Sequence, residues 1–305
     1  MPIPVMRRLR PSALALGASL LTFGVFPADA AKKPVPVVHP RFDGPEITFR
    51  MAPMPASSRS IAVSVLTNLH VAFDTERCRT HTAWSGRGLH LLGPQYSRAK
   101  RPFISTNDTP VLWTMPPRVP WATAMPDTAG TEPTLASARY RAVSSKGGVA
   151  TFIYELKTTN SETIPVHESP RGLHVADMDL VVRRIEVGPG TNELWFAAHS
   201  AFGRISALPG PASGFLISRP NEPHLITFVK SHLGLDILTD SRNTEFNEEV
   251  FTELGAEKGN PTKLRKGQLA TGWIRLPART RAMVFEVITF ATEGEQERMR
   301  IDPKV

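Results

Sequence analysis

The sequence predicts an all-β protein, a large antiparallel β-sandwich, with a supersandwich as the larger variant of that architecture. About ten segments alternate apolar and polar residues as half-buried strands do, at spacings of about 8 to 15 residues. Several successive segments are joined by short turns that contain glycine, and such turns favour antiparallel pairing. One short helix and one long loop rich in proline and tryptophan are expected to interrupt the strands.

Residues 61–93 contain three strand-like runs joined by two turns, the pattern of a β-meander. In the first run, residues 65–73, every second residue from Leu69 onward is large and apolar, so these side chains are expected on one buried face. In the second run, residues 80–84, Trp84 lies on the same face as the single cysteine two residues before the run begins. The predicted core residues of the meander are Leu69, Val71, Phe73, Cys78 and Trp84.

Further strands follow in order along the chain. Residues 138–145 and 149–159 flank a Lys-Gly-Gly turn and form the clearest predicted hairpin. A second pair, residues 174–187 and 192–199, flanks a Gly-Pro-Gly turn. The remaining strands are predicted at residues 47–50, 224–230, 234–239, 268–276 and 283–291.

One helix is predicted over residues 243–255. An Asn-Thr pair can cap its start, and Phe246, Val250 and Leu254 follow at four-residue spacing. Three glutamates near the start suit the positive end of a helix dipole, and a glycine stands at the end.

The N-terminus has the features of a signal peptide. Arginines within residues 7–10 precede an apolar stretch at 13–26 and an Ala-Asp-Ala cleavage site at 28–30. The alternative is an uncleaved membrane anchor, although the apolar stretch is short for a span of about 20 residues. Export predicts a secreted or periplasmic protein with no membrane span after cleavage. The predicted organisation is a signal peptide at 1–30, an extended lead-in at 31–60, a single β-sandwich domain at 61–292 and a polar tail at 293–305.

The formal net charge is +8 and the basic residues are spread along the chain. Clusters at residues 98–101 and 263–266 could meet an anionic polysaccharide, lipid headgroups or a protein, and a solvated surface is the simpler explanation. Nucleic acid is not expected as a partner, because the chain is predicted to be exported and has no recognised binding motif. A polysaccharide or an envelope protein is the predicted partner.

The chain contains one cysteine, Cys78, which therefore cannot form an internal disulfide. A small core thiol is expected there rather than a reactive nucleophile. The sequence has no Cys-x-x-Cys-His motif for haem, no cysteine pair for structural zinc, and no recognised ligand spacing among its nine histidines. We therefore predict no cofactor and no metal site.

Two groups of residues could carry acid/base chemistry. His174 is close in sequence to Asp177 and Asp179, and two carboxylates on one strand face could bind calcium or divide the acid and base roles. Solvated aspartates on an exposed strand explain the same residues. His199 and Glu193 form a second candidate pair. No Gly-x-Ser-x-Gly motif supports a serine hydrolase.

Residues 94–133 form the predicted long loop, and loops of this length are more often functional than decorative. Rigid aromatic planes beside polar groups such as Asn107 and Asp108 could stack on sugar rings and orient their hydroxyls. The alternative is that the aromatic residues anchor the loop to the sandwich. A site is expected where the meander meets this loop. The predicted binding residues are Trp84, Tyr96, Trp113, Trp121 and Arg118.

Residues 71–94, VAFDTERCRTHTAWSGRGLHLLGP, resemble a segment of uncharacterised domains in secreted bacterial multidomain proteins, in which an FDxExCR motif and an AWSG-type motif precede a loop with proline and tryptophan. The matching residues are Phe73, Asp74, Glu76, Cys78, Arg79, Ala83, Trp84, Gly86 and Leu89. Because such domains accompany c-type cytochrome or carbohydrate-related modules, the resemblance implies a role in the cell envelope. It implies no activity, and this chain has no haem motif.

Three hypotheses for the function remain open. The first is an exported envelope protein that binds carbohydrate or another envelope component through the aromatic loop. The second is a sugar-active enzyme, an epimerase or a lyase, that uses a histidine and a carboxylate. The third is a structural or interaction protein without a small-molecule site.

Overall fold

The computed structural model describes residues 37–38, 48–51, 57, 59–86, 89–91, 105–107, 111–125, 134–145, 149–208, 213–249 and 262–292. They fall within one compact unit, residues 35–305. The described residues form strands and turns and no helix, so none of them forms a helix that could cross a membrane. The predicted signal peptide and polar tail lie outside the described residues.

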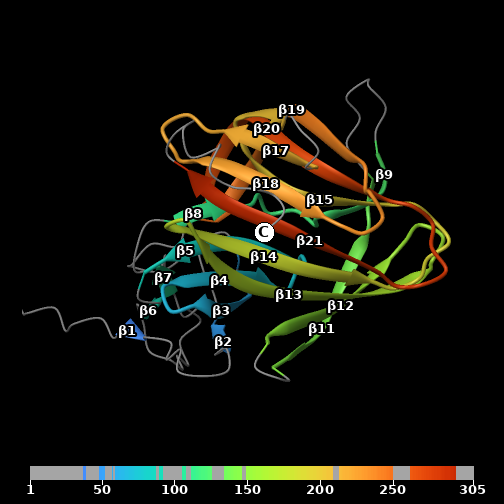
Figure 1. Ribbon diagram of the computed structural model, residues 1–305, viewed down its shortest axis with the longest axis horizontal. Coiled ribbons are helices and arrows are strands. Elements are labelled where there is room, and N and C mark those ends of the chain that lie inside the picture. The colour runs from blue at the N-terminus through green and yellow to red at the C-terminus, as the bar shows by residue number, and fades with distance from the viewer. Residues whose placement is uncertain are drawn as a thin grey trace, which may run out of the picture. The chain divides into compact units, whose positions relative to one another are not determined.

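The largest sheet has eight antiparallel strands (Figure 1). Its strands come from two meanders, β11 to β14 and β16 to β18, and the late strand β21 pairs with both and joins them. The order across the sheet is β11 (Ser137–Ser144), β12 (Thr151–Lys157), β13 (Thr163–Val175), β14 (Met178–Val187), β21 (Met283–Thr292), β18 (His224–Lys230), β17 (Gly214–Ser218) and β16 (Arg204–Ala207).

Two five-stranded sheets and one small sheet complete the described fold. The first five-stranded sheet contains β2 (Thr48–Met51), β3 (Ser60–Leu66), β4 (Leu69–Asp74), β5 (Arg79–Ser85) and β8 (Val111–Thr114). The second contains β10 (Thr134–Leu135), β9 (Trp121–Ala124), β15 (Leu194–Phe202), β20 (Thr262–Leu276) and β19 (Ile237–Glu249). The small sheet contains β1 (Val37–Val38), β6 (Leu89–Leu91) and β7 (Ser105–Asn107).

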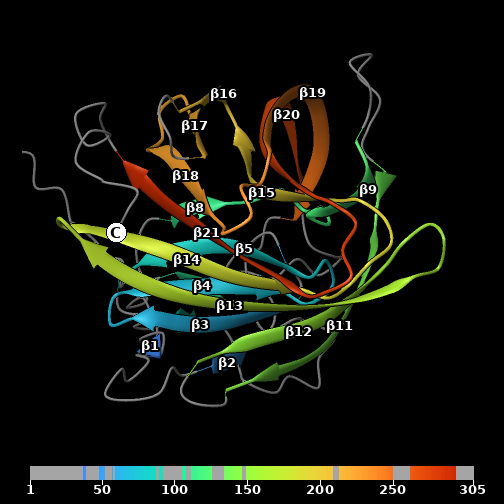
Figure 2. The same ribbon diagram turned by 45° about the vertical axis from the view of Figure 1, so that its right-hand side comes forward.

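One face of the eight-stranded sheet packs against both five-stranded sheets and forms a β-sandwich, as the sequence predicts. Figure 2 shows β13 and β14 overlying β3 to β5. Phe73 of β4 stacks on Phe152 of β12 with ring centroids 4.0 Å apart, and Phe196 of β15 meets Phe285 of β21 at 5.8 Å. Burial of each such side chain contributes roughly 1.5–3 kcal/mol to stability. These contacts place one shared hydrophobic core between the layers.

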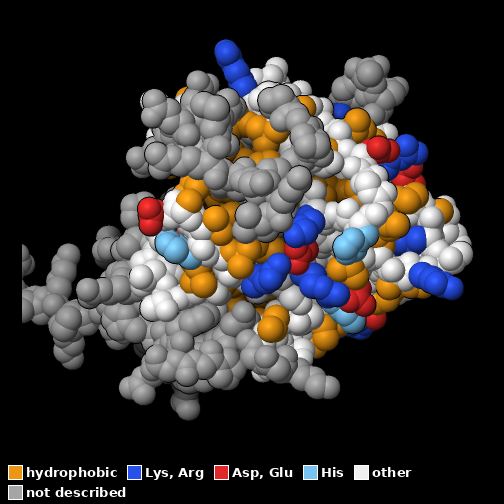
Figure 3. Space-filling model, viewed as in Figure 1, with side chains coloured by type: hydrophobic (Ala, Val, Ile, Leu, Met, Phe, Trp, Pro, Cys, Tyr) orange, Lys and Arg blue, Asp and Glu red, His pale blue; other side chains and the backbone are white. Residues whose placement is uncertain are grey.

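The opposite face of the eight-stranded sheet carries a second hydrophobic cluster. Its buried members are Met178, Leu180, Leu216, Ile226 and Phe290. Figure 3, seen from this side, shows hydrophobic side chains beside basic and acidic ones. The ion pair between Arg171 and Glu286, at 2.9 Å, belongs to the same sheet. This sheet therefore has apolar side chains on both faces, which explains the long apolar runs of its central strands.

The predicted meander is present as β3 to β5, with two corrections. Leu69, Val71, Phe73, Cys78 and Trp84 are all buried, as expected. The predicted first strand, residues 65–73, is instead divided into β3 and β4 by a Thr-Asn turn at 67–68. The third predicted run begins with β6, which pairs with β1 and β7 in a separate sheet. Burial raises the pKa of the Cys78 thiol to about 12, which is the behaviour of a core thiol.

The helix predicted over residues 243–255 is wrong for the part that the structure describes. Residues 243–249 belong to β19, which pairs with β20 over its whole length. Exposure alternates along it, so that Phe246 is half-buried and Glu245 is exposed. Glu245 forms a cross-strand ion pair with Lys266 at 2.8 Å. Pairing with the next strand of the chain therefore overrides the local four-residue spacing.

The predicted strand at 174–187 also contains a turn. Ala176 and Asp177 adopt φ angles of 48° and 65°, and they connect β13 to β14 as a two-residue hairpin turn. Such a turn needs positive φ at both central positions, and aspartate tolerates that conformation better than most residues. The Ala-Asp pair lacks the glycine that usually marks this turn in a sequence.

The long loop predicted at 94–133 contains regular structure. Strands β7, β8 and β9 lie within it, and β8 and β9 extend the two five-stranded sheets. The backbone of β8 pairs with β5, where Trp113 lies opposite Ala83. The loop is therefore divided between the two sheets.

Candidate functional site

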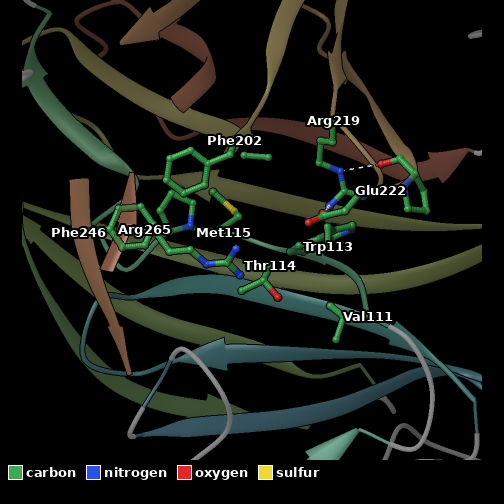
Figure 4. Close-up of a pocket in the computed structure, with 12 residues that line it drawn as sticks. Val111, Trp113, Thr114, Met115, Phe202, Arg219, Glu222, Phe246 and Arg265 are labelled. Atoms are coloured by element: carbon green, nitrogen blue, oxygen red, sulfur yellow. Dashed lines mark hydrogen bonds and ion pairs between the residues drawn. The ribbon is translucent and has the colours of Figure 1, made fainter. Parts of the chain in front are cut away.

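A pocket of about 350 Å³ lies where parts of all three large sheets come together (Figure 4). β8 and the turn after it form one wall, and the ends of β15, β19 and β20 form another. The turn between β17 and β18 supplies the third wall. The lining residues are Val111, Trp113, Thr114, Met115, Pro116, Ala201, Phe202, Arg219, Glu222, Pro223, Phe246 and Arg265.

Two phenylalanines form the apolar part of the lining. Phe202 at the end of β15 stacks on Phe246 of β19, with centroids 5.4 Å apart and an interplanar angle of 18°. Figure 4 shows Arg265 and Met115 beside this pair. Arg265 of β20 lies opposite Phe246 in the strand register and is exposed. A flat apolar surface and a cation therefore line the same cavity.

Arg219 is the buried cation of the pocket, with a side chain only 6% exposed. Its Nε donates to the carbonyl of Pro223 at 2.6 Å, and Nη2 donates to the carbonyl of Leu112 at 2.9 Å. Nη1 forms an ion pair with Glu222 Oε2 at 2.7 Å. Burial lowers the pKa of Arg219, and Glu222 opposes this effect. The guanidinium therefore spans the turn and β8 in a fixed position.

The inner wall of the pocket is Trp113, whose side chain meets His199 edge-on at 4.9 Å. A β-bulge at Ala198 changes the register of β15 before His199, which is completely buried. Burial lowers the pKa of His199 well below its usual value, and Arg183 and Arg219 add to this effect. Neither ring nitrogen of His199 has a hydrogen-bond partner among the described residues.

A buried ion pair lies deeper in the core. Glu168 and Arg183, on the neighbouring strands β13 and β14, approach to 3.6 Å and are both at most 1% exposed. Thr80 donates to Glu168 at 2.5 Å, and the hydroxyl of Tyr154 donates to it at 3.3 Å. Arg183 also donates to the carbonyl of Ala198 in the bulge. Burial raises the pKa of Glu168, while Arg183 and the two hydroxyls oppose this.

A second buried ion pair supports the pocket wall. Arg79 and Asp74 lie 3.3 Å apart with no exposed side-chain area. Arg79 also donates to the carbonyls of Met115 and Pro116, two lining residues. Burial alone would raise the pKa of Asp74, but Arg79 and its other charged neighbours hold it below the usual value. The meander thus fixes the turn that follows β8.

His81 makes folding stability depend on pH. Burial lowers its pKa to about 3, with Arg79 adding to the effect and Asp74 opposing it. Between pH 6.5 and 3 the unfolded chain binds a proton that the folded chain does not, so stability falls as pH decreases. His81 should contribute a loss of about 2 kcal/mol between pH 6.5 and pH 5, at about 1.4 kcal/mol per pH unit. Urea unfolding at both pH values measures it.

The matched variant for this pH prediction is His81→Gln. Glu168 contributes a slope of the opposite sign, because its raised pKa removes stability as pH rises above its usual value. The difference between wild type and His81→Gln isolates the histidine. An unchanged slope in the variant would contradict the assignment.

The structure brings one of the predicted binding residues to the pocket. Trp113 lines it, but its side chain is buried, as are those of Trp84 and Trp121. The three indoles therefore offer no open face to a sugar ring. Arg118 is half-buried and donates to Thr244 of β19 at 3.3 Å. Tyr96 lies outside the described residues, as does Asp108.

The predicted acid/base residues do not meet in the pocket. His174 and Asp179 are hydrogen-bonded at 2.8 Å, but they lie on the exposed part of the β13–β14 hairpin, and Asp177 is in its turn. Glu193 accepts hydrogen bonds from Trp195 and Arg275, and none from His199. The described lining contains one carboxylate, that of Glu222, and no histidine. A sugar-active enzyme is therefore not favoured over a binding protein.

Sequence reasoning missed the main residues of the pocket. Phe202 and Arg219 carry no local motif, and the spacing around Phe246 predicts a helix. The sequence places Arg265 only in a basic cluster. The five lining residues between Val111 and Pro116 do lie in the passage where a site was expected. Among the described residues, no three histidine, cysteine or acidic side chains are grouped as metal ligands would be.

No family model matches the sequence, and no curated protein matches it significantly. Among solved structures, the chain is similar to a heparinase III with methylated lysines, at a TM-score of 0.41 and 8% identity over 84% of this chain and 37% of that chain. For a second structure of that gene product, the TM-score is 0.38 and the identity is 7%, over 83% of this chain and 39% of that chain. For another heparinase III, the TM-score is 0.35 and the identity is 8%, over 83% of this chain and 36% of that chain. The chain spans less than half the length of these proteins, and likenesses this weak say nothing about its activity.

Proposed function

We propose that this protein is an exported binding protein of the cell envelope, and that its pocket takes an acidic saccharide. One observation carries the proposal: a stacked phenylalanine pair and two arginines line the same cavity. The C–H face of a sugar ring can lie against an aromatic ring, and guanidinium groups suit carboxylates and sulfates. A uronate or a sulfated sugar carries both features in one unit.

Two further properties support this proposal. A cavity of about 350 Å³ is within the range of small-ligand sites. Without the first thirty residues, which hold three arginines and one aspartate, the formal net charge is +6 (8 − 3 + 1), and this favours encounter with an acidic polymer. The envelope location rests on the leader-like features of the first thirty residues.

Titration calorimetry with an oligogalacturonate and a neutral maltooligosaccharide of equal length tests the proposal. The acidic sugar should bind and the neutral one should not. Phe246→Ala should weaken binding about tenfold, because it removes half of the stacked pair. Leu238→Ala is the matched control, since Leu238 is an exposed apolar residue of the same strand that does not line the pocket.

Equal affinity of Phe246→Ala and wild type would place the ligand elsewhere. Absence of binding to galacturonate and to sulfated oligosaccharides alike would overturn the proposed function.

A further inference from the structure

We propose that Arg219 is the specificity-determining cation of the pocket, and that Glu222 is its internal competitor, which a ligand carboxylate or sulfate replaces. This inference rests on the proposed function of the pocket, because it states how an acidic ligand is distinguished from a neutral one there.

Arg219 is held in place without any help from a ligand. Two of its three nitrogens donate to main-chain carbonyls, one in β8 and one in the turn before β18. These acceptors are parts of the fold and cannot move away when a ligand arrives. They are also neutral, so they do not balance the charge of the guanidinium. One nitrogen, Nη1, remains for a charged partner.

Glu222 is that charged partner, and it differs from Arg219 in exposure. Its side chain is 57% exposed, whereas that of Arg219 is 6% exposed. The two members of this ion pair therefore lose different amounts when it breaks. The exposed carboxylate of Glu222 is almost as well satisfied by water, whereas the buried guanidinium of Arg219 needs another anion in its place. Both residues line the pocket, so the exchange takes place inside it.

The exchange gives the site its selectivity. An acidic ligand replaces one anion by another, so the buried guanidinium keeps a counter-charge throughout. A neutral saccharide that displaced Glu222 would leave that charge unpaired, and unpaired charges in desolvated sites are costly. A neutral ligand that left Glu222 in place would have to share the cavity with it. Only an anionic group avoids both costs.

Glu222→Gln tests the inference, because it keeps the shape of the side chain and removes the competing charge. The variant should bind oligogalacturonate about fivefold more tightly than wild type does, and inorganic sulfate should show a gain in the same direction. Glu193→Gln is the matched control, since Glu193 is also paired with an arginine, at 2.6 Å, and lies outside the pocket. A cooperative urea unfolding transition in each variant confirms that it is folded.

The outcomes separate the inference from the proposed function. Tighter sulfate binding by Glu222→Gln, with no binding of galacturonate or of sulfated oligosaccharides by any variant, would support Glu222 as the competitor and overturn the proposed acidic saccharide ligand. Galacturonate binding of equal or lower affinity in Glu222→Gln would overturn the competitor and leave the function standing. An equal gain in Glu193→Gln would also overturn it, because net charge alone would then explain the effect.

Discussion

Glu168→Gln is expected to lower the free energy of unfolding by about 3–5 kcal/mol, the usual cost of leaving one member of a buried ion pair without its partner. The substitution preserves the shape of the side chain, but the amide has one acceptor oxygen and so keeps only one of the two hydrogen bonds that Thr80 and Tyr154 donate to Glu168. It removes the negative charge that faces Arg183, which is buried on β14. Urea unfolding at pH 7, followed by far-UV circular dichroism, measures the loss.

The double variant Glu168→Gln/Arg183→Met separates the charge effect from loss of contacts. Each single variant leaves one unpaired charge in the core, whereas the double variant leaves none. The double variant should therefore lose less stability than the sum of the losses in the two single variants. Glu286→Gln is the control, since its pair with Arg171 is partly exposed, with side chains 21% and 48% exposed, and should contribute no more than about 1 kcal/mol. A loss as small in Glu168→Gln as in Glu286→Gln would show that the buried pair is not intact in solution.

The strands were predictable because each carries its own alternation. Phe152, Tyr154 and Leu156 are completely buried in β12, as period two requires. The error at Phe246 has the opposite origin. Phe246 lies in β19 because residues 262–276 pair with that strand, and the four-residue spacing within residues 243–255 contains no information about that partner.

Local sequence patterns do not predict the buried charges either. Glu168 has the inward phase of Ile164 and Val166, yet a glutamate in a strand is normally placed outward. Its burial depends on Arg183, which stands in another strand and reaches it only through the register of the sheet. The pocket is similar, because residues from five separate segments line it. Sequence reasoning found the segment of β8, where prolines and tryptophan gather, and could not place the other four against it.

Trp121→Ala is expected to destabilise the protein by about 3–5 kcal/mol, as large-to-small substitutions of buried aromatic residues do. The Trp121 side chain is completely buried, meets Phe196 at 4.5 Å and donates to the hydroxyl of Tyr154 at 3.1 Å. Its loss would leave a cavity beside the buried hydroxyl that Glu168 accepts from. Trp121→Phe should lose less stability, because it keeps most of the apolar volume and removes the N–H donor.

Trp121→Ala also tests whether Trp121 anchors the loop or contacts a bound sugar. Trp121 does not line the pocket, so folded Trp121→Ala should bind oligogalacturonate as wild type does, with its urea midpoint strongly lowered. Phe246→Ala should show the reverse, with weaker binding and a smaller change in the midpoint, since Phe246 is only half-buried. If Trp121→Ala kept its midpoint and lost binding, Trp121 would be a ligand contact and not an anchor. The two variants together therefore test whether ligand binding depends on the aromatic residues of the loop or on the pocket residues contributed by β15, β19 and the 219–223 turn.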